Sequence, residues 1–208
     1  QLNTQFPDHQ IFRGAPLGNE YTHGSKRYLW IFDPLDGVAN VQAGIPIWGI
    51  SLALVENFWP VCGAIFLPAT GDEFQAVAGR EALRGDEVIN TASLDSVSDE
   101  SVLLTYSRVH LQDHTTFPGK IRNMGCTTAH ICYVAQGRAD AAIIANESFQ
   151  GLAAARVIIE AAGGKIYKMD GREFFLNEYL DGGRINEHLL VTTPGICHQV
   201  LNTLNRTN

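Results

Sequence analysis

Two aspartates, Asp33 and Asp36, follow an apolar and aromatic stretch at residues 28–32. An apolar run that stops at Asp-Pro predicts a buried strand ending in a turn, where the two carboxylates can converge. Together with the carbonyl oxygen of Leu35, they are hard oxygen ligands, which Mg²⁺ prefers when it also holds waters and a phosphate. The segment therefore predicts a divalent metal site.

The turn after Asp36 is suited to contact a phosphate. Gly37 and Val38 can present backbone N–H groups to an anion, as turns and nests do. A simpler interpretation is that Asp-Pro and Asp-Gly are common turn dipeptides with no ligand. A bare D-P-x-D-G string leaves both interpretations open, and the rest of the sequence has to decide between them.

The elements that must position this turn form two groups along the chain. The first half carries strand-like runs, at residues 28–32, 47–55, 59–67 and 71–78, with 80–83 completing a hairpin. They predict an antiparallel or mixed sheet. The second half alternates strands and helices, with strands at 101–105, 139–145, 165–168 and 188–192 and helices at 127–135, 149–164 and 195–205. This order predicts a mixed α/β fold in which helices cover a sheet.

Two local signals delimit the most apolar helix of the second half. Ser148 is a residue type that caps helix N-termini, and Gly163-Gly164 is a typical helix end. No proline-rich, serine-rich or charged linker divides the chain. We therefore expect one domain over residues 1–208, with a sheet half at about 1–95 and a second α/β half at about 96–208.

Composition and charge limit the classes of function. The 208 residues are 45% hydrophobic and 18% charged, which is typical of a globular protein, and the net charge is −7. An acidic surface disfavours nucleic acid and anionic membranes as partners. The four cysteines form no CxxC pair, which favours reduced thiols in a cytoplasmic protein. The longest apolar run, at 45–55, is too short to span a membrane.

Several stretches in order resemble the inositol monophosphatase family. Residues 30–40 and 45–54 resemble its strand-D-P-x-D-G-T-x-N motif and the following P-x-x-x-x-S strand. Four further segments resemble other family motifs, at residues 6–11, 125–129, 134–141 and 154–164. The resemblance runs from about residue 6 to residue 193. Ordered matches of this kind are far more specific than any single motif.

This resemblance implies a fold, a reaction and a set of site residues. The fold is the layered αβαβα sandwich of the inositol monophosphatase and fructose-1,6-bisphosphatase type, usually a homodimer, with the family's N-terminal helical part missing from this chain. The reaction is Mg²⁺-dependent hydrolysis of inositol or sugar monophosphates. The implied metal ligands are Asp33, Leu35 and Asp36, and the implied phosphate or substrate contacts are Asp36, Gly37, Val38 and Thr127.

The sequence departs from the family pattern at positions that matter for catalysis. The family's metal-binding glutamate falls on Ala15, and its water-orienting threonine is Val38. Its second-metal aspartate falls on Gln150, or one residue later in a second register, and neither position is acidic. Glu20 and Glu147 are the nearest acidic residues that a rearranged site could use instead.

These substitutions predict weakened Mg²⁺ binding and hydrolysis. A lost charge-assisted contact costs roughly 1 to 3 kcal/mol, and lost proton-transfer groups cost about 10² to 10⁴ in rate. We therefore expect a weakly active or inactive member of the family that acts through binding of a phosphorylated small molecule or a protein. The alternative is an active Mg²⁺-dependent phosphomonoesterase with substituted ligands.

Overall fold

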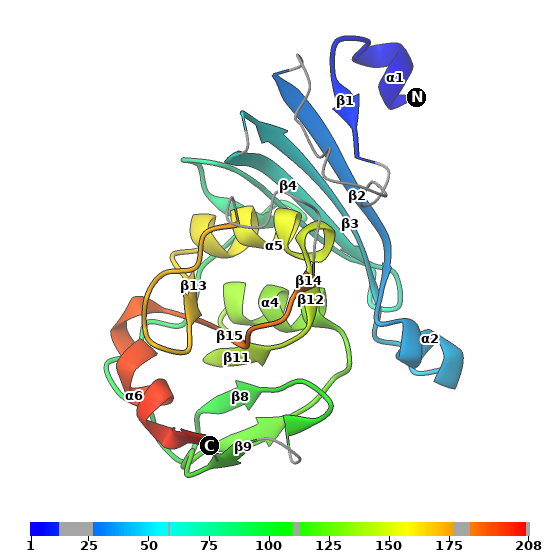
Figure 1. The fold of residues 1–208 in the computed structure, drawn as a ribbon. Coiled ribbons are helices and arrows are strands. Elements are labelled where there is room, and N and C mark those ends of the chain that lie inside the picture. Colours follow the sequence, from blue (N-terminus) through cyan, green and yellow to red (C-terminus); the bar gives the residue numbers. More distant parts are fainter. Residues whose placement is uncertain (13–26, 58, 110–112, 177–183, 207–208) are drawn as a thin grey trace.

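The first half of the described chain forms a seven-stranded sheet (Figure 1). The computed structural model describes residues 1–12, 27–57, 59–109, 113–176 and 184–206. The strands follow chain order: β1 (Gln10–Ile11), β2 (Tyr28–Asp36), β3 (Gly49–Glu56), β4 (Trp59–Leu67), β5 (Asp72–Val77), β6 (Ala82–Arg84) and β7 (Glu87–Ile89). All neighbours are antiparallel except β1 and β2, which are parallel, so the sheet is mixed as expected.

The second half forms a five-stranded mixed sheet and its helices. Its strand order is β10 (Lys120–Arg122), β8 (Val102–Leu104), β11 (Ala141–Ile144), β15 (Leu189–Thr192) and β13 (Lys165–Lys168). The two long helices are α4 (Thr127–Ala135) and α5 (Phe149–Ala161). The predicted cap of α5 is confirmed, because the Ser148 hydroxyl accepts a hydrogen bond from the Gly151 N–H at 3.0 Å.

The remaining elements are short. They are α1 (Leu2–Gln5), α2 (Val38–Ala43), the 3₁₀ helix η2 (Pro194–Ile196), α6 (Cys197–Thr203), and the strand pairs β12 (Glu147–Ser148) with β14 (Arg184–Ile185) and β9 (Asp113–Thr115) with β16 (Leu204–Arg206). The single helix expected over 195–205 was therefore wrong in detail. It is a 3₁₀ turn at Pro194, a shorter α-helix and a strand, since the last residues pair with β9.

Helices α4 and α5 lie between the two sheets, as Figure 1 shows, and share one apolar core with both. The other face of the five-stranded sheet packs against η2 and α6. Helix α5 approaches β4 closely at Gly63, where a Cβ atom would lie 2.5 Å from the carbonyl oxygen of Ala154. This packing confirms the predicted layered α/β architecture and fixes the N-terminus of α5 beside the end of β2.

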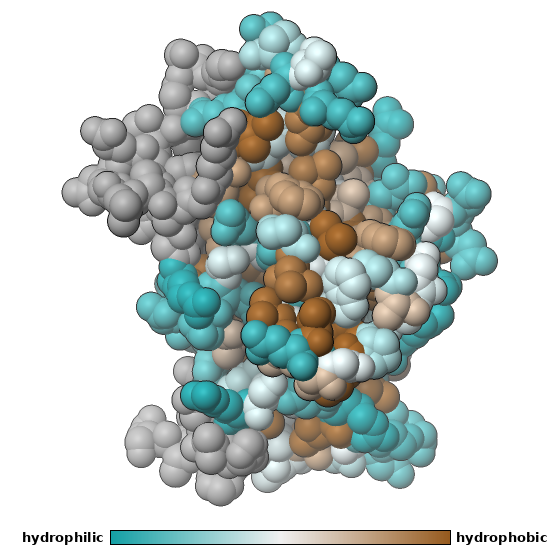
Figure 2. All heavy atoms as spheres, turned by 90° about the vertical axis from the view of Figure 1, so that its right-hand side faces the viewer, coloured by the Kyte–Doolittle hydropathy of each residue, from teal (hydrophilic) through white to brown (hydrophobic). Residues whose placement is uncertain are grey.

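The outer face of the seven-stranded sheet is apolar and partly open. Strands alternate their side chains between two faces, and the inner face supplies the core. On the outer face Phe32, Phe66, Val77 and Val88 stay 38% to 48% exposed. Figure 2 views this side and shows hydrophobic side chains gathered between hydrophilic margins. Among the residues that the structure describes, no helix has the length and apolar composition to cross a membrane.

Candidate functional site

The residues predicted to bind metal and phosphate line one open cavity of about 1020 Å³. The cavity lies where the end of β2, the start of α4 and the start of α5 meet. Its lining includes Asp33, Leu35, Asp36, Gly37, Val38, Thr127 and Gln150. Residues from three separate segments of the sequence are thus brought together. Ala15, the remaining predicted position, and Glu20 lie outside the described residues.

Asp33 is placed by an irregularity in β2. The pairing with β3 shifts between Asp33, opposite Ser51, and Asp36, opposite Gly49. This shift lets two carboxylates three residues apart face the same cavity. Burial raises the pKa of Asp33, the Leu35 N–H donated to its Oδ1 at 3.2 Å opposes that rise, and the charge of Asp36 adds to it.

Asp36 ties the turn to the N-terminus of α4. Its Oδ2 accepts hydrogen bonds from the Thr128 N–H at 2.6 Å, from the Thr128 hydroxyl at 2.9 Å and from the Cys126 thiol at 3.3 Å. A carboxylate at a helix N-terminus is also favoured by the helix dipole. One oxygen of Asp36 is therefore engaged in holding the site together, which orients the side chain for any ligand bound by the other oxygen.

Glu147, which the sequence analysis named only as a possible substitute ligand, also lines the cavity. It lies in β12, immediately before the cap of α5, and its Oε1 accepts a hydrogen bond from the Thr127 hydroxyl at 2.5 Å. Burial raises the pKa of Glu147 to about 7, and the charges of Asp36 and Asp33 add to this rise. The hydrogen bond from Thr127 and the charge of Arg184 oppose it. The signal in the sequence that could have placed Glu147 in the site was its position directly before the N-cap serine of α5.

Val38 lines the cavity at the position where the resemblance in the sequence implies a threonine. It begins α2, a helix that the sequence analysis did not predict, and its side chain is 50% exposed. The preceding Gly37 has φ 86°, and a Cβ atom there would lie 2.9 Å from the Ile47 carbonyl oxygen. Glycine is therefore required at the turn. Val38 offers a backbone N–H but no side-chain group that could orient water.

Cys126 and His130, which line the cavity beside Asp36, are neutral near pH 7. Burial raises the pKa of the Cys126 thiol to about 12, and the charge of Asp36 adds to the rise. This result supports a packed thiol rather than an activated nucleophile. Burial lowers the pKa of His130 to about 4, although Asp36 opposes that shift. The Nε2 of His130 accepts a hydrogen bond from the Met124 N–H at 3.1 Å.

The oxygen atoms of the cavity are of the chemical type that binds a hard divalent cation. Asp33, Asp36 and Glu147 offer carboxylate oxygens to one cavity, and Leu35 offers a backbone carbonyl. Within the described ranges, no three His, Cys, Asp or Glu side chains already stand close enough to hold a metal ion. The carboxylates therefore fit Mg²⁺ by chemical type and by their place in one cavity.

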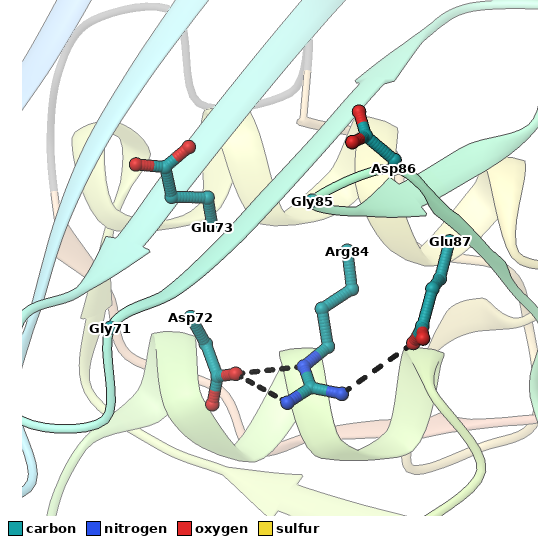
Figure 3. A pocket seen from close by; sticks show the side chains of 7 residues that line it. All are labelled: Gly71, Asp72, Glu73, Arg84, Gly85, Asp86 and Glu87. Carbon is teal, nitrogen blue, oxygen red and sulfur yellow. Dashed lines mark hydrogen bonds and ion pairs between the residues drawn. The ribbon is translucent and has the colours of Figure 1, made fainter.

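A second hollow, of about 450 Å³, lies beside the β6–β7 turn (Figure 3). Asp72 and Glu87 both point toward Arg84, whereas Glu73 and Asp86 point away from it. Arg84 donates to Asp72 Oδ1 at 2.7 Å and lies 3.8 Å from Glu87 Oε2. Arg84 is therefore engaged by Asp72 and Glu87, and we assign no site to this hollow.

Comparison with known proteins agrees with this geometry. Residues 1–202 match the sequence profile of the inositol monophosphatase family. The chain belongs to the inositol monophosphatase family. Its sheets and intervening helices also superpose on an inositol monophosphatase from Anabaena, with a TM-score of 0.75, 24% identity, and coverage of 97% of this chain and 79% of that one. The fold predicted from the motifs is thus confirmed.

Curated relatives of this family member carry several names. A protein from Xylella fastidiosa named Nus factor SuhB is 31% identical over 184 residues, which are 83% of this chain and 65% of that protein. A fructose-1,6-bisphosphatase/inositol-1-monophosphatase from Aquifex aeolicus is 28% identical over 189 residues, which are 86% and 70% of the two chains. The chain thus spans about two thirds of the length of these relatives.

Proposed function

We propose that this family member binds a phosphorylated small molecule together with Mg²⁺ in the cavity at the end of β2, and hydrolyses it weakly or not at all. Family members are generally Mg²⁺-dependent and act on phosphorylated small molecules. The observation that carries the proposal is that the predicted metal and phosphate residues line one cavity, in which Val38 presents an apolar side chain.

The chain's own residues suggest how the ligand would be held. Asp33, the Leu35 carbonyl and Asp36 would hold the cation, and the backbone N–H groups of Gly37 and Val38 would contact a phosphate. When bound, Mg²⁺ supplies Lewis-acid stabilisation of phosphoryl oxygens and activates water. Asp36 keeps its orientation through the hydrogen bonds from α4 described above.

Two features oppose fast hydrolysis. At Val38 the cavity lacks a hydroxyl to orient the attacking water, which costs about 10² to 10⁴ in rate. At Gln150 an amide stands where the first register of the family resemblance implies a carboxylate, so a second cation would be held less tightly. The alternative, an efficient phosphomonoesterase, requires other groups to replace both functions.

Phosphate release from inositol and sugar monophosphates, with and without Mg²⁺, tests the proposal. We expect slow or no release by the natural chain and faster release by the Val38→Thr variant. Calorimetric titration should show that the same monophosphates bind in the presence of Mg²⁺ and that Asp33→Asn weakens this binding. Brisk turnover by the natural chain, abolished by Asp33→Asn, would refute the impaired reaction and support the alternative.

We also propose that residues 1–208 act as one domain, since α4 and α5 share one core with both sheets. The cavity draws its walls from both halves of the chain, so neither half carries the site alone. The homodimer, a protein partner and the cytoplasmic location stay predictions from the sequence.

A further inference from the structure

We propose that Glu147 is a metal ligand of this chain, replacing a carboxylate that the family carries on the first turn of α5. The inference rests on the proposed function, because it concerns the same cation and the same cavity. It identifies the third acidic residue that Asp33 and Asp36 require. It also gives a reason why a glycine, Gly151, stands where the second register of the sequence comparison places the family's aspartate.

Gly151 is a buried position on the first turn of α5, next to Gln150, which lines the cavity, and its neighbours include carboxylate oxygens of the site. A Cβ atom there would lie 3.5 Å from Asp33 Oδ2 and 3.5 Å from Glu147 Oε2. A side chain at this position would therefore start between the two carboxylates. The helix presents only backbone at that point, and the oxygens of Ser148, Asp33 and Glu147 lie around it at contact distance.

Glu147 brings a carboxylate to this place from β12, the strand that precedes α5. Its backbone is held in β12, which pairs Glu147 with Ile185. Oε1 accepts the Thr127 hydroxyl, and no hydrogen-bond donor among the residues that the structure describes contacts Oε2, which faces Gly151. One oxygen thus fixes the side chain, and the other lies next to Gly151, as Asp33 Oδ2 does.

An acidic residue at position 147 or at position 151 would supply the same kind of metal ligand. An aspartate at 151 or a glutamate at 147 places one negative carboxylate beside Asp33, and both together would place three charges in a small space. Like charges at this range are costly unless a cation joins them. The pairing of an acidic residue at 147 with a glycine at 151 is therefore consistent with a single relocated ligand.

A purely structural role for Glu147 makes a different prediction. If its only task were to accept the Thr127 hydroxyl, glutamine would serve nearly as well, because the amide oxygen is also an acceptor. A ligand role requires the negative charge. Glu147→Gln keeps the size and the acceptor and removes only the charge, so it separates the two roles.

Calorimetric titration with Mg²⁺ and with Mn²⁺, without substrate, tests the inference. Glu147→Gln should weaken metal binding by about 10- to 100-fold, since hydrogen-bonded or ligating charges contribute about 1.5 to 3 kcal/mol. The double variant Glu147→Gln/Gly151→Asp should recover most of the loss. Glu87→Gln removes an equal charge at the distant hollow of Figure 3 and should leave metal affinity unchanged.

The outcomes separate this inference from the proposed function. If Asp33→Asn weakens metal binding but Glu147→Gln does not, Glu147 is not a ligand and the proposed site stands. If neither variant affects metal binding, the proposed site itself is wrong. Circular dichroism and thermal melting establish that each variant is folded. If the double variant does not fold, the comparison of Glu147→Gln with Glu87→Gln still decides.

Discussion

Without metal, the protein should lose stability as the pH rises through the range in which Glu147 titrates. The carboxyl has a pKa of about 7 in the folded chain and an ordinary value of 4.5. Between these values the folded protein keeps a proton that the unfolded chain has released. Folding is therefore favoured at low pH, and this advantage is fully present below pH 4.5 and is lost as the pH rises to about 7.

The size of this effect follows from the same two values. Each tenfold change in proton affinity is worth about 1.4 kcal/mol, so the difference between 4.5 and about 7 corresponds to roughly 3 kcal/mol. Burial of the carboxyl is the largest cause, and the nearby charges of Asp36 and Asp33 add to it. A loss of this size is a large part of the stability of an ordinary domain.

Urea unfolding of the natural chain and of Glu147→Gln, at about pH 5 and about pH 8, measures this contribution. The glutamine does not titrate, so the natural chain should lose roughly 3 kcal/mol more than the variant over this range. The raised pKa of Asp33 acts in the same direction in both proteins and cancels in the comparison. Equal pH dependence of the two proteins would show that Glu147 titrates normally and that the burial argument is wrong.

Three further predictions concern the same region. Mg²⁺ affinity, measured by calorimetry, should fall as the pH drops below about 7, because protonation of Glu147 removes a charge. Ser148→Ala should lower the urea unfolding free energy by about 1 kcal/mol, because it removes the cap on the Gly151 N–H. Gly63→Ala should destabilise by about 1 to 3 kcal/mol in the same assay, since its Cβ would meet the Ala154 carbonyl, and an unchanged midpoint would contradict that contact.

Most of the fold could be predicted because its signals are local. Strand-like runs bounded by turn residues predicted β3 to β5, and the helix over residues 127–135 has the predicted bounds. Ser148 predicted the start of α5, and the structure confirms this cap because the Ser148 hydroxyl accepts a hydrogen bond from the Gly151 N–H. Such elements depend on neighbours in the sequence, so periodicity and capping residues are enough to find them.

The elements that were missed depend on tertiary contacts. Helix α2 is short and exposed except at Asn40, whose amide anchors it by donating to the carbonyls of Ile47 and Met124 at 2.7 Å. Met124 lies far away in the sequence. The strand at the C-terminal end likewise exists because β9 is there to pair with it. Contacts between segments that lie far apart in the sequence cannot be predicted from a local pattern of residues.

The site was predictable to the level of the motif but not to the level of its charge balance. Asp33 and Asp36 share one turn, so their proximity follows from three residues of sequence. Whether a third carboxylate joins them depends on how α5 lies against the end of β2, and that is set by the close contact of Gly63 with Ala154. The two registers of the family resemblance place the missing aspartate either at Gln150, whose side chain lines the cavity, or at Gly151, next to oxygens of Asp33 and Glu147. The number of carboxylates in the cavity therefore depends on packing as well as on the family motifs, because Glu147, which the sequence offered only as a substitute, lines it with Asp33 and Asp36.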